Sequence, residues 1–443
     1  MINTLSSIDM LNSIGNSTVT YVNQSLVSPM TLANEFRELV AKDKDVRLKS
    51  EATYDVQYPT GFMDLDYNLG QKIVVYDNNG NAISTYDSIG IVDGSINMVV
   101  GRTGCGKSTF CKQSAGNIVR PFRTASIFED SIEGGITGKR NEVLLNMTPE
   151  EVHNRLHMRN DGITSESFFK RFKTIHDIKM QKRDDFLYDT GKCDSRGIPI
   201  YKLEPTVYIL DSLAVLVPEK LAEEEEVSGQ MSTTAAAKLL ARIFRTLVAM
   251  CKEANIILFT INHITDDVSI NPMQKKKAQN IYLDQGETTP GGRTPFYLSN
   301  NVFRIEDSRK TKEMEALGVT GVFADICVLK SRTSVAKRDP VCTLIFEQER
   351  GFNPMLSLLI SLKSYDMIGG AGAYLYLKGH EDIKFSQKKF LPMLVEKPEF
   401  YQAFIHTCAS VFSNALHERD NVEVIDTAQM NLDIMKAIFE MQS

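Results

Sequence analysis

The sequence predicts an α/β fold with a mainly parallel central sheet. Between about residues 96 and 360, short apolar runs alternate with stretches of helical spacing, as in a sheet flanked by helices. A glycine-rich segment at 101–108 joins the first apolar run to a proline-free stretch at 108–119. The chain of 443 residues is 42% hydrophobic and 24% charged, which suits one large α/β domain with additions.

Apolar runs bounded by polar residues are the strand candidates. We expect strands at 96–100, 124–128, 206–210, 256–261, 301–305, 325–329 and 342–346. Helical stretches separate the first four runs. Those strands are expected to be parallel, because a parallel connection needs a crossover.

Shifts in composition divide the chain into three expected parts. Residues 1–55 are polar apart from a helix-like spacing at 31–42, which predicts an N-terminal helical arm for oligomerisation. Residues 56–360 form the expected core, with a hairpin signal (NNGN) at 78–81. Residues 361–443 pass from a glycine-rich turn to 374–377 (YLYL) and a helical segment from Lys388, which predicts a small C-terminal α+β domain.

Charge and cysteine usage exclude several classes of protein. The net charge of −6 argues against a uniformly basic coat for nucleic acid, but it permits local basic loops. No apolar run approaches the roughly 18 residues needed to span a membrane, so no membrane partner is expected. The seven cysteines form no C-x-x-C pair and the N-terminus has no secretory pattern. We expect a reduced, cytoplasmic protein without structural zinc, in the host cytoplasm if the source is viral.

The segment GRTGCGKS at 101–108 has the G-x-x-x-x-G-K-[ST] pattern of a phosphate-binding loop. Glycines let the backbone aim its N–H groups at phosphate, the lysine reaches the β and γ oxygens, and the final hydroxyl binds Mg²⁺. The residues expected to hold the nucleotide are Gly101, Arg102, Thr103, Gly104, Cys105, Gly106, Lys107, Ser108 and Thr109.

Acidic residues follow two of the predicted strands. The run at 206–210 ends in Asp211, which is expected to share Mg²⁺ with Ser108. The run at 124–128 is followed by Glu129, our first choice for the group that orients the attacking water. Glu133 is the alternative, because the acidic stretch can be read in two registers.

Two further strand ends carry polar residues. His263 follows the run at 256–261 and fits a sensor that contacts the γ-phosphate and relays its loss. Lys330 and Arg332 follow the run at 325–329, and their i, i+2 spacing places both cations on one side. Such a pair could stabilise charge on a neighbouring subunit's phosphate.

Taken together, these residues resemble the RecA recombinases, the phage UvsX branch in particular. The resemblance covers roughly residues 56–415. It is carried by 211–218 (DSLAVLVP) with the acidic loop and helix (235–252) that follow, by 261–264 (INHI), by 287–292 (ETTPGG) running into 296–305 (FYLSNNVFRI), and by 329–333 (LKSRT).

The resemblance implies a RecA-like P-loop ATPase that forms a helical filament on DNA, with each ATP between two subunits. Lys107, Glu129 and His263 would act within one subunit, and Lys330 and Arg332 on the neighbour's ATP. Axial loops at about 217–230 and 264–295 would hold single-stranded DNA. Within them, the residues singled out for DNA binding are Lys275, Lys276, Lys277, Gly291, Gly292 and Arg293.

The implied activity is homologous pairing and strand exchange in recombination, repair and replication. The implied partners are single- and double-stranded DNA, further copies of the chain, and single-strand-binding and mediator proteins. The sequence departs from the bacterial pattern in insertions at about 71–92 and 135–200, in a second loop of unusual length, and in the lack of an acidic tail.

Two alternatives stay open. A ring-shaped replicative DNA helicase has the same core, and the stretch from 107 to 131 looks somewhat like short phage helicases. Such helicases carry a further domain in front and usually end after the core, unlike this chain. A non-hydrolysing scaffold is the other alternative, and the presence of Lys107, Ser108, Asp211 and a glutamate at a strand end argues against it.

Overall fold

The computed structural model describes residues 56–76, 81–134, 138–193, 199–220, 229–266, 281–308, 315–318, 321–372 and 374–420. These residues belong to one compact unit. The predicted arm at 1–55, most of the first predicted DNA loop, and Lys275, Lys276 and Lys277 lie outside the described residues.

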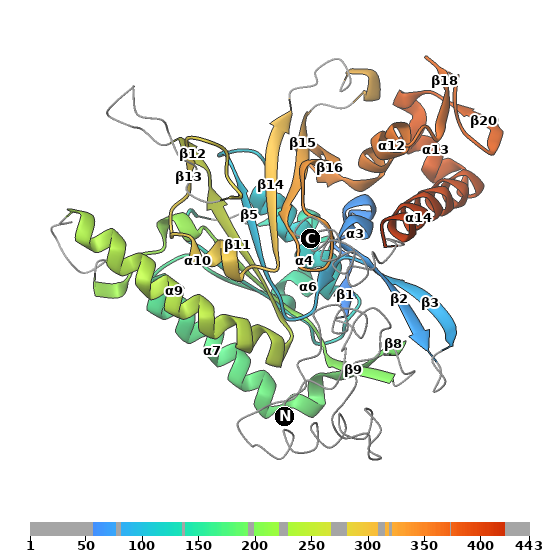
Figure 1. Cartoon of the computed structure of the whole chain (residues 1–443). Helices are drawn as coiled ribbons and strands as arrows, with labels where there is room; N and C mark the ends of the chain where they lie inside the picture. Colours follow the sequence, from blue (N-terminus) through green and yellow to red (C-terminus); the bar gives the residue numbers. More distant parts are fainter. Residues whose placement is uncertain are drawn as a thin grey trace, which may run out of the picture. The chain divides into compact units, whose positions relative to one another are not determined.

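The described chain is mixed α/β and is built on a large, mostly parallel central sheet (Figure 1). The strand order is β17-β16-β15-β14-β5-β11-β10-β6-β7. All neighbours from β14 to β7 pair in parallel, and β14 to β17 pair antiparallel. The strands are β5 (Ile96–Gly101), β6 (Ile127–Ser131), β7 (Leu156–Arg159), β10 (Thr206–Asp211), β11 (Ile256–His263), β14 (Asn301–Ser308), β15 (Gly321–Lys330), β16 (Lys337–Glu347) and β17 (Gly351–Asn353).

The strand expected at 124–128 is displaced by three residues. β6 begins at Ile127 and includes Glu129 and Asp130 within the sheet. Thr124 lies before the strand, where its backbone N–H and hydroxyl donate to Glu204 Oε2 at 2.9 and 2.5 Å. The prediction was wrong because it treated the acidic residues as the end of the strand, whereas both are buried inside it.

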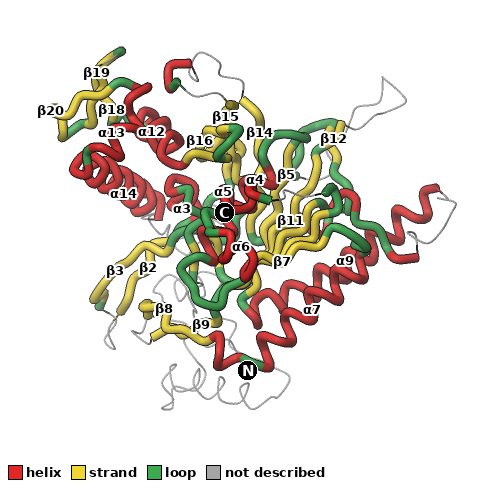
Figure 2. The backbone as a smooth tube through the Cα atoms, turned by 180° about the vertical axis from the view of Figure 1, so that it is seen from behind, coloured by secondary structure: helices red, strands yellow, loops and turns green. Residues whose placement is uncertain are grey.

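Helices cover the two faces of the sheet. The helix α4 (Lys107–Val119) packs on one face through Phe110, Cys111 and Ala115. The helices α7 (Ser165–Gln181) and α9 (Gly229–Ala254) lie side by side on the other face, as both ribbon views show (Figures 1 and 2). No helix in the described part of the chain has the length and apolar character that crossing a bilayer requires.

The elements after the sheet form a third apolar cluster, which includes Phe390, Phe400 and Phe404. These elements are α12 (Pro354–Ser364), β18 (Ile368–Ala371), β19 (Tyr374–Leu377), β20 (His380–Phe385), α13 (Phe390–Glu396) and α14 (Pro398–Asp420) (Figure 1). The boundary expected between residues 360 and 361 falls inside α12, which also contacts the β16 strand of the central sheet.

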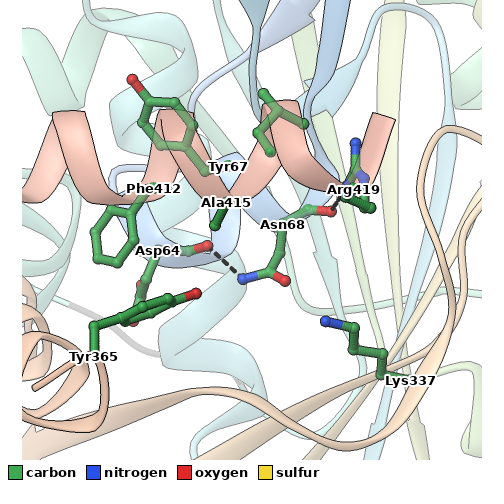
Figure 3. Close-up of a pocket in the computed structure, with 9 residues that line it drawn as sticks. Asp64, Tyr67, Asn68, Lys337, Tyr365, Phe412, Ala415 and Arg419 are labelled. Atoms are coloured by element: carbon green, nitrogen blue, oxygen red, sulfur yellow. Dashed lines mark hydrogen bonds between the residues drawn. The ribbon is translucent and has the colours of Figure 1, made fainter. Parts of the chain in front are cut away.

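The hairpin predicted around 78–81 is present as β2 (Gln71–Tyr76) paired with β3 (Ala82–Ser88). A second hairpin, β8 (Leu187–Cys193) with β9 (Pro199–Leu203), lies in the other predicted insertion. Near the first hairpin, α14 is tied to α3 (Met63–Leu69) and the residue after it, because Arg419 donates to the carbonyls of Asn68 and Gly70 at 2.9 and 2.6 Å. The cavity between them is about 80 Å³, too small for a nucleotide (Figure 3).

Candidate functional site

The glycine-rich loop leaves β5 at Gly101 and enters α4 at Lys107. Gly104 and Gly106 have φ of +81° and +93°, in the left-handed region that favours glycine. A Cβ atom at Gly106 would lie 2.6 Å from the ring of Phe352. The sharp turn therefore requires glycine at Gly106 for two reasons, backbone conformation and close packing.

The start of α4 is electropositive. Lys107 is 5% exposed, and its Nζ donates to the carbonyls of Gly101 and Arg102 at 3.1 and 2.7 Å. The N-cap residue is Gly106, which has no side chain to cap the helix. A buried ammonium beside the N-terminus of a helix favours an anion such as phosphate.

Ser108 and Asp211 meet beside this helix start. The Ser108 hydroxyl donates to Asp211 Oδ2 at 2.6 Å. They come together because β5 and β10 flank β11 in the parallel part of the sheet, so their carboxyl ends share one edge. Burial raises the pKa of Asp211, and the Ser108 hydrogen bond opposes this rise. The hydroxyl and carboxylate are oxygen ligands of the kind that Mg²⁺ takes.

Glu133 and His263 complete the same edge. Glu133 Oε1 accepts from the Ser212 hydroxyl at 2.7 Å and lies 3.0 Å from His263 Nε2. The other ring nitrogen of His263 is 3.4 Å from the hydroxyl of Thr103 in the glycine-rich loop. Burial acts to raise the pKa of Glu133, but the hydrogen bonds from Ser212 and His263 and the nearby positive charge hold it below its usual range. The carboxylate is 43% exposed, so water can reach it.

Glu129 lies elsewhere. It shares the α4 face of β6 with Ile127 and forms an ion pair with Lys112 at 2.7 Å, and both side chains are 1% exposed. Burial raises the pKa of Glu129, and Lys112 opposes the rise. Of the two carboxylates left open by the sequence, the structure brings Glu133 to Ser212 and His263, and it places Glu129 in a buried ion pair.

Asp130 faces the opposite side of the sheet from Glu129. It is fully buried and accepts from Arg159 at 2.6 Å, from the Tyr208 hydroxyl at 2.6 Å, and from Arg171. The sequence did not reveal this network, because its partners come from β7, β10 and α7. The network stabilises the buried strand and lies away from the exposed carboxylate of Glu133.

Lys330 and Arg332 lie on the same side, as their i, i+2 spacing predicts, and both donate to the Tyr297 carbonyl. Lys330 Nζ donates to the carbonyls of Phe296, Tyr297 and Ser299 at 3.0, 2.7 and 2.7 Å, at the end of α10 (Thr294–Leu298). Arg332 donates to the Tyr297 carbonyl at 3.2 Å. Burial, with a smaller contribution from Arg332, lowers the pKa of Lys330 to about 8.

The predicted DNA-binding glycines lie against α9. Gly291 and Gly292 have φ of +85° and +77°, and a Cβ at Gly291 would approach Leu213 at 3.3 Å. They precede Arg293, which is exposed and begins the turn into α10. Gly291, Gly292 and Arg293 thus lie together beside α9, whereas Lys275, Lys276 and Lys277 lie outside the described residues.

The sequence-based prediction of DNA-binding residues did not include a row of cations on α9. Lys238, Arg242, Arg245 and Lys252 are all exposed. Their i, i+4, i+7 and i+14 spacing places them on one side of the helix, opposite Leu240 and Leu247 in the core. The only acidic residue of α9 is Glu253. The helical spacing of these cations is visible in the sequence and could have identified the row.

A scan against models of known protein families finds no match to this chain, and a search of curated proteins finds none.

Proposed function

We propose that the protein is an ATP-dependent DNA recombinase of the RecA type. The observation that carries this proposal is the convergence of Lys107, Ser108, Asp211, Glu133 and His263 at one edge of the sheet. The five residues come from four separate parts of the sequence, and together they include each group that phosphoryl transfer to water requires.

In this proposal, the backbone from Gly101 to Thr109 cradles the phosphates of ATP, and Lys107 approaches the β and γ oxygens. Lys107 would exchange its present carbonyl partners for phosphate oxygens, which are stronger acceptors. Ser108 and Asp211 would hold Mg²⁺, whose charge offsets the negative charge of the phosphate oxygens. The hydrogen bond between Ser108 and Asp211 supports this assignment, because it brings the two oxygens within 2.6 Å of each other.

Glu133 is the residue that we assign to the attacking water, in place of Glu129. Its carboxylate is ionised near neutral pH, partly exposed, and oriented by Ser212 and His263. Glu129 is a poor candidate because moving it to water would break its buried ion pair with Lys112. His263 contacts both Glu133 and Thr103, and we assign to it the response to loss of the γ-phosphate.

The DNA site is assigned to the surface that begins at Gly291, Gly292 and Arg293. These two glycines contact α9, and the exposed cations of α9 continue the surface along that helix. From Lys238 to Lys252 the row spans about 21 Å at the helical rise of 1.5 Å per residue, so it could follow several phosphates of a strand. Lys275, Lys276 and Lys277 would add further phosphate contacts.

The proposal includes assembly of the subunits into a helical filament. Lys330 and Arg332 are the cations assigned to the ATP of a neighbouring subunit, where they would offset charge in the transition state. Single- and double-stranded DNA are the proposed substrates, with single-strand-binding and mediator proteins as further partners.

Electron microscopy of the full chain tests this function. The protein is mixed with single-stranded DNA, Mg²⁺ and a slowly hydrolysed ATP analogue, and Lys107→Ala serves as the control that cannot hold phosphate. Helical filaments that form only with the unsubstituted protein are expected. Six-membered rings that unwind duplex DNA would instead identify a replicative helicase, and DNA binding that ignores the nucleotide would point to a scaffold.

A further inference from the structure

An ion pair joins the glycine-rich loop to a small strand pair at its side. Arg102 donates to both carboxylate oxygens of Asp266, with Nη1 3.1 Å from Oδ2 and Nη2 2.8 Å from Oδ1. The two side chains are 63% and 61% exposed. The contact has the two-pronged geometry that makes arginine selective for planar anions.

Asp266 belongs to this strand pair. β12 (Thr265–Asp266) runs antiparallel to β13 (Glu287–Thr288), with Asp266 opposite Glu287. Glu287 is 7% exposed and accepts from Arg304 of β14 at 2.8 and 2.9 Å. The strand pair is therefore held by the sheet through a buried ion pair and by the glycine-rich loop through an exposed one.

A polar cavity of about 410 Å³ separates these two attachments. Arg102, Thr103 and Cys105 line it from the loop, and Glu287, Arg304 and Asp307 line it from the strands. The cavity gives the exposed Arg102 side chain space to change partner. The backbone of Arg102 is also part of the phosphate site, because its carbonyl accepts from Lys107 Nζ at 2.7 Å.

We propose that Arg102 is a positioning residue that exchanges between Asp266 and a phosphate held in the glycine-rich loop. With the loop empty, Arg102 fixes β12. With phosphate present, the guanidinium turns to the more strongly charged anion, and β12 loses its ion pair with the glycine-rich loop. This Arg102–Asp266 latch rests on the proposed nucleotide binding, and it links the phosphate site to β12 and β13 by a route separate from His263.

The size of the effect follows from exposure. A solvent-exposed ion pair changes an equilibrium by about two- to five-fold, and a coupling between two sites cannot exceed the interaction that transmits it. We therefore expect a change of that order in the opening of the β12–β13 pair.

Hydrogen–deuterium exchange of the full chain tests the latch. Peptides that contain Thr265–Asp266 and Glu287–Thr288 are followed with Mg²⁺ alone and with Mg²⁺ and the imido analogue of ATP. In the unsubstituted protein, the analogue should speed exchange of these amides by about two- to five-fold. Asp266→Asn should exchange fast in both conditions, because its latch is already open.

Asp284→Asn is the matched control. Asp284 is also exposed and ion-paired, but its partners are Arg304 and Arg338 rather than the glycine-rich loop. This variant should keep the response to the analogue. Binding of the analogue with unchanged exchange, or a response that survives in Asp266→Asn, would overturn the latch alone. A protein that does not bind the analogue at all would overturn the proposed function and the latch with it.

Discussion

His263 Nε2 lies 3.0 Å from Glu133 Oε1, so the end of β11 and the segment after β6 meet at one carboxylate. The same oxygen accepts from Ser212, and the next residue before Ser212 is Asp211, which holds Ser108. A change in the ionisation or position of Glu133 therefore alters the contacts of Ser212, beside β10, and of His263 on β11, and these residues lie next to the glycine-rich loop. This relationship is the basis of the first prediction.

Glu133→Gln should reduce ATP hydrolysis by about 100- to 10,000-fold while nucleotide binding persists, because the amide cannot accept the proton of the attacking water. Steady-state hydrolysis and equilibrium binding of an ATP analogue measure the two effects separately. Glu129→Gln is the matched comparison. It should lower the free energy of unfolding by about 3–5 kcal/mol, because Lys112 is left buried without its carboxylate. A stable Glu129→Gln protein that binds ATP but does not hydrolyse it would return the catalytic role to Glu129.

Lys330→Ala should abolish DNA-stimulated hydrolysis and leave ATP binding intact. The proposed role of the lysine is on the neighbour's phosphate, so the loss should appear only when DNA assembles the subunits. Thermal unfolding of the unassembled variant is the control, because Lys330 also donates to three carbonyls at the end of α10. Unchanged DNA-stimulated turnover would remove the assignment to the neighbouring site.

Replacing Lys238, Arg242 and Arg245 together by alanine should weaken binding of single-stranded DNA and flatten its dependence on salt. Each lost phosphate contact lowers the slope of log K against log salt by about 0.7. Titrations at several salt concentrations measure the slope. The charge-matched control replaces Lys384, Lys388 and Lys389, which are exposed on the C-terminal elements. Equal slopes in the two triple variants would exclude α9 as a DNA surface.

The same titration applies to Lys275, Lys276 and Lys277. Neutralising these three lysines should also weaken DNA binding and reduce the salt slope, because three closely spaced charges can replace counterions on a strand. If the slope is unchanged, they are surface charges that do not contact DNA.

Lys179 predicts a dependence of stability on pH. It is 3% exposed and donates to the Glu204 carbonyl at 2.7 Å, and its burial lowers its pKa to about 7. An unfolded lysine keeps its proton to a pKa of about 10.4, so the unfolded state binds more protons between about pH 7 and 10. Lys179 alone should make the free energy of unfolding rise with pH in that window, by at most about 1.4 kcal/mol per pH unit.

Urea unfolding at several pH values measures this slope. Lys179→Met should have a smaller slope, whatever its overall stability, because it removes one group that titrates in this window and leaves Lys330, whose pKa is about 8. An equal slope in the variant and the unsubstituted protein would mean that Lys179 stays protonated in the folded state.

Most of the sheet could be predicted from local pattern. β5, β10 and β11 are fully or almost fully buried apolar runs, and such runs between helices are typical of parallel strands. The prediction misplaced β6, where charged residues lie inside a buried strand, and it did not include β7 or β17. Burial is tolerated there because Lys112 pairs with Glu129, and Arg159 and Arg171 pair with Asp130.

The sequence by itself determined the order along the chain of the seven strands that it predicted, the glycine-rich loop, and the acidic end of β10 at Asp211, because each depends on residues close to one another in the chain. Only the tertiary structure decided which carboxylate reaches the site. Glu133 and His263 are 130 residues apart, and they meet because β6, β10 and β11 are neighbours in a parallel sheet. Glu129 is instead held in a buried pair with Lys112, a contact set by how α4 packs on the sheet.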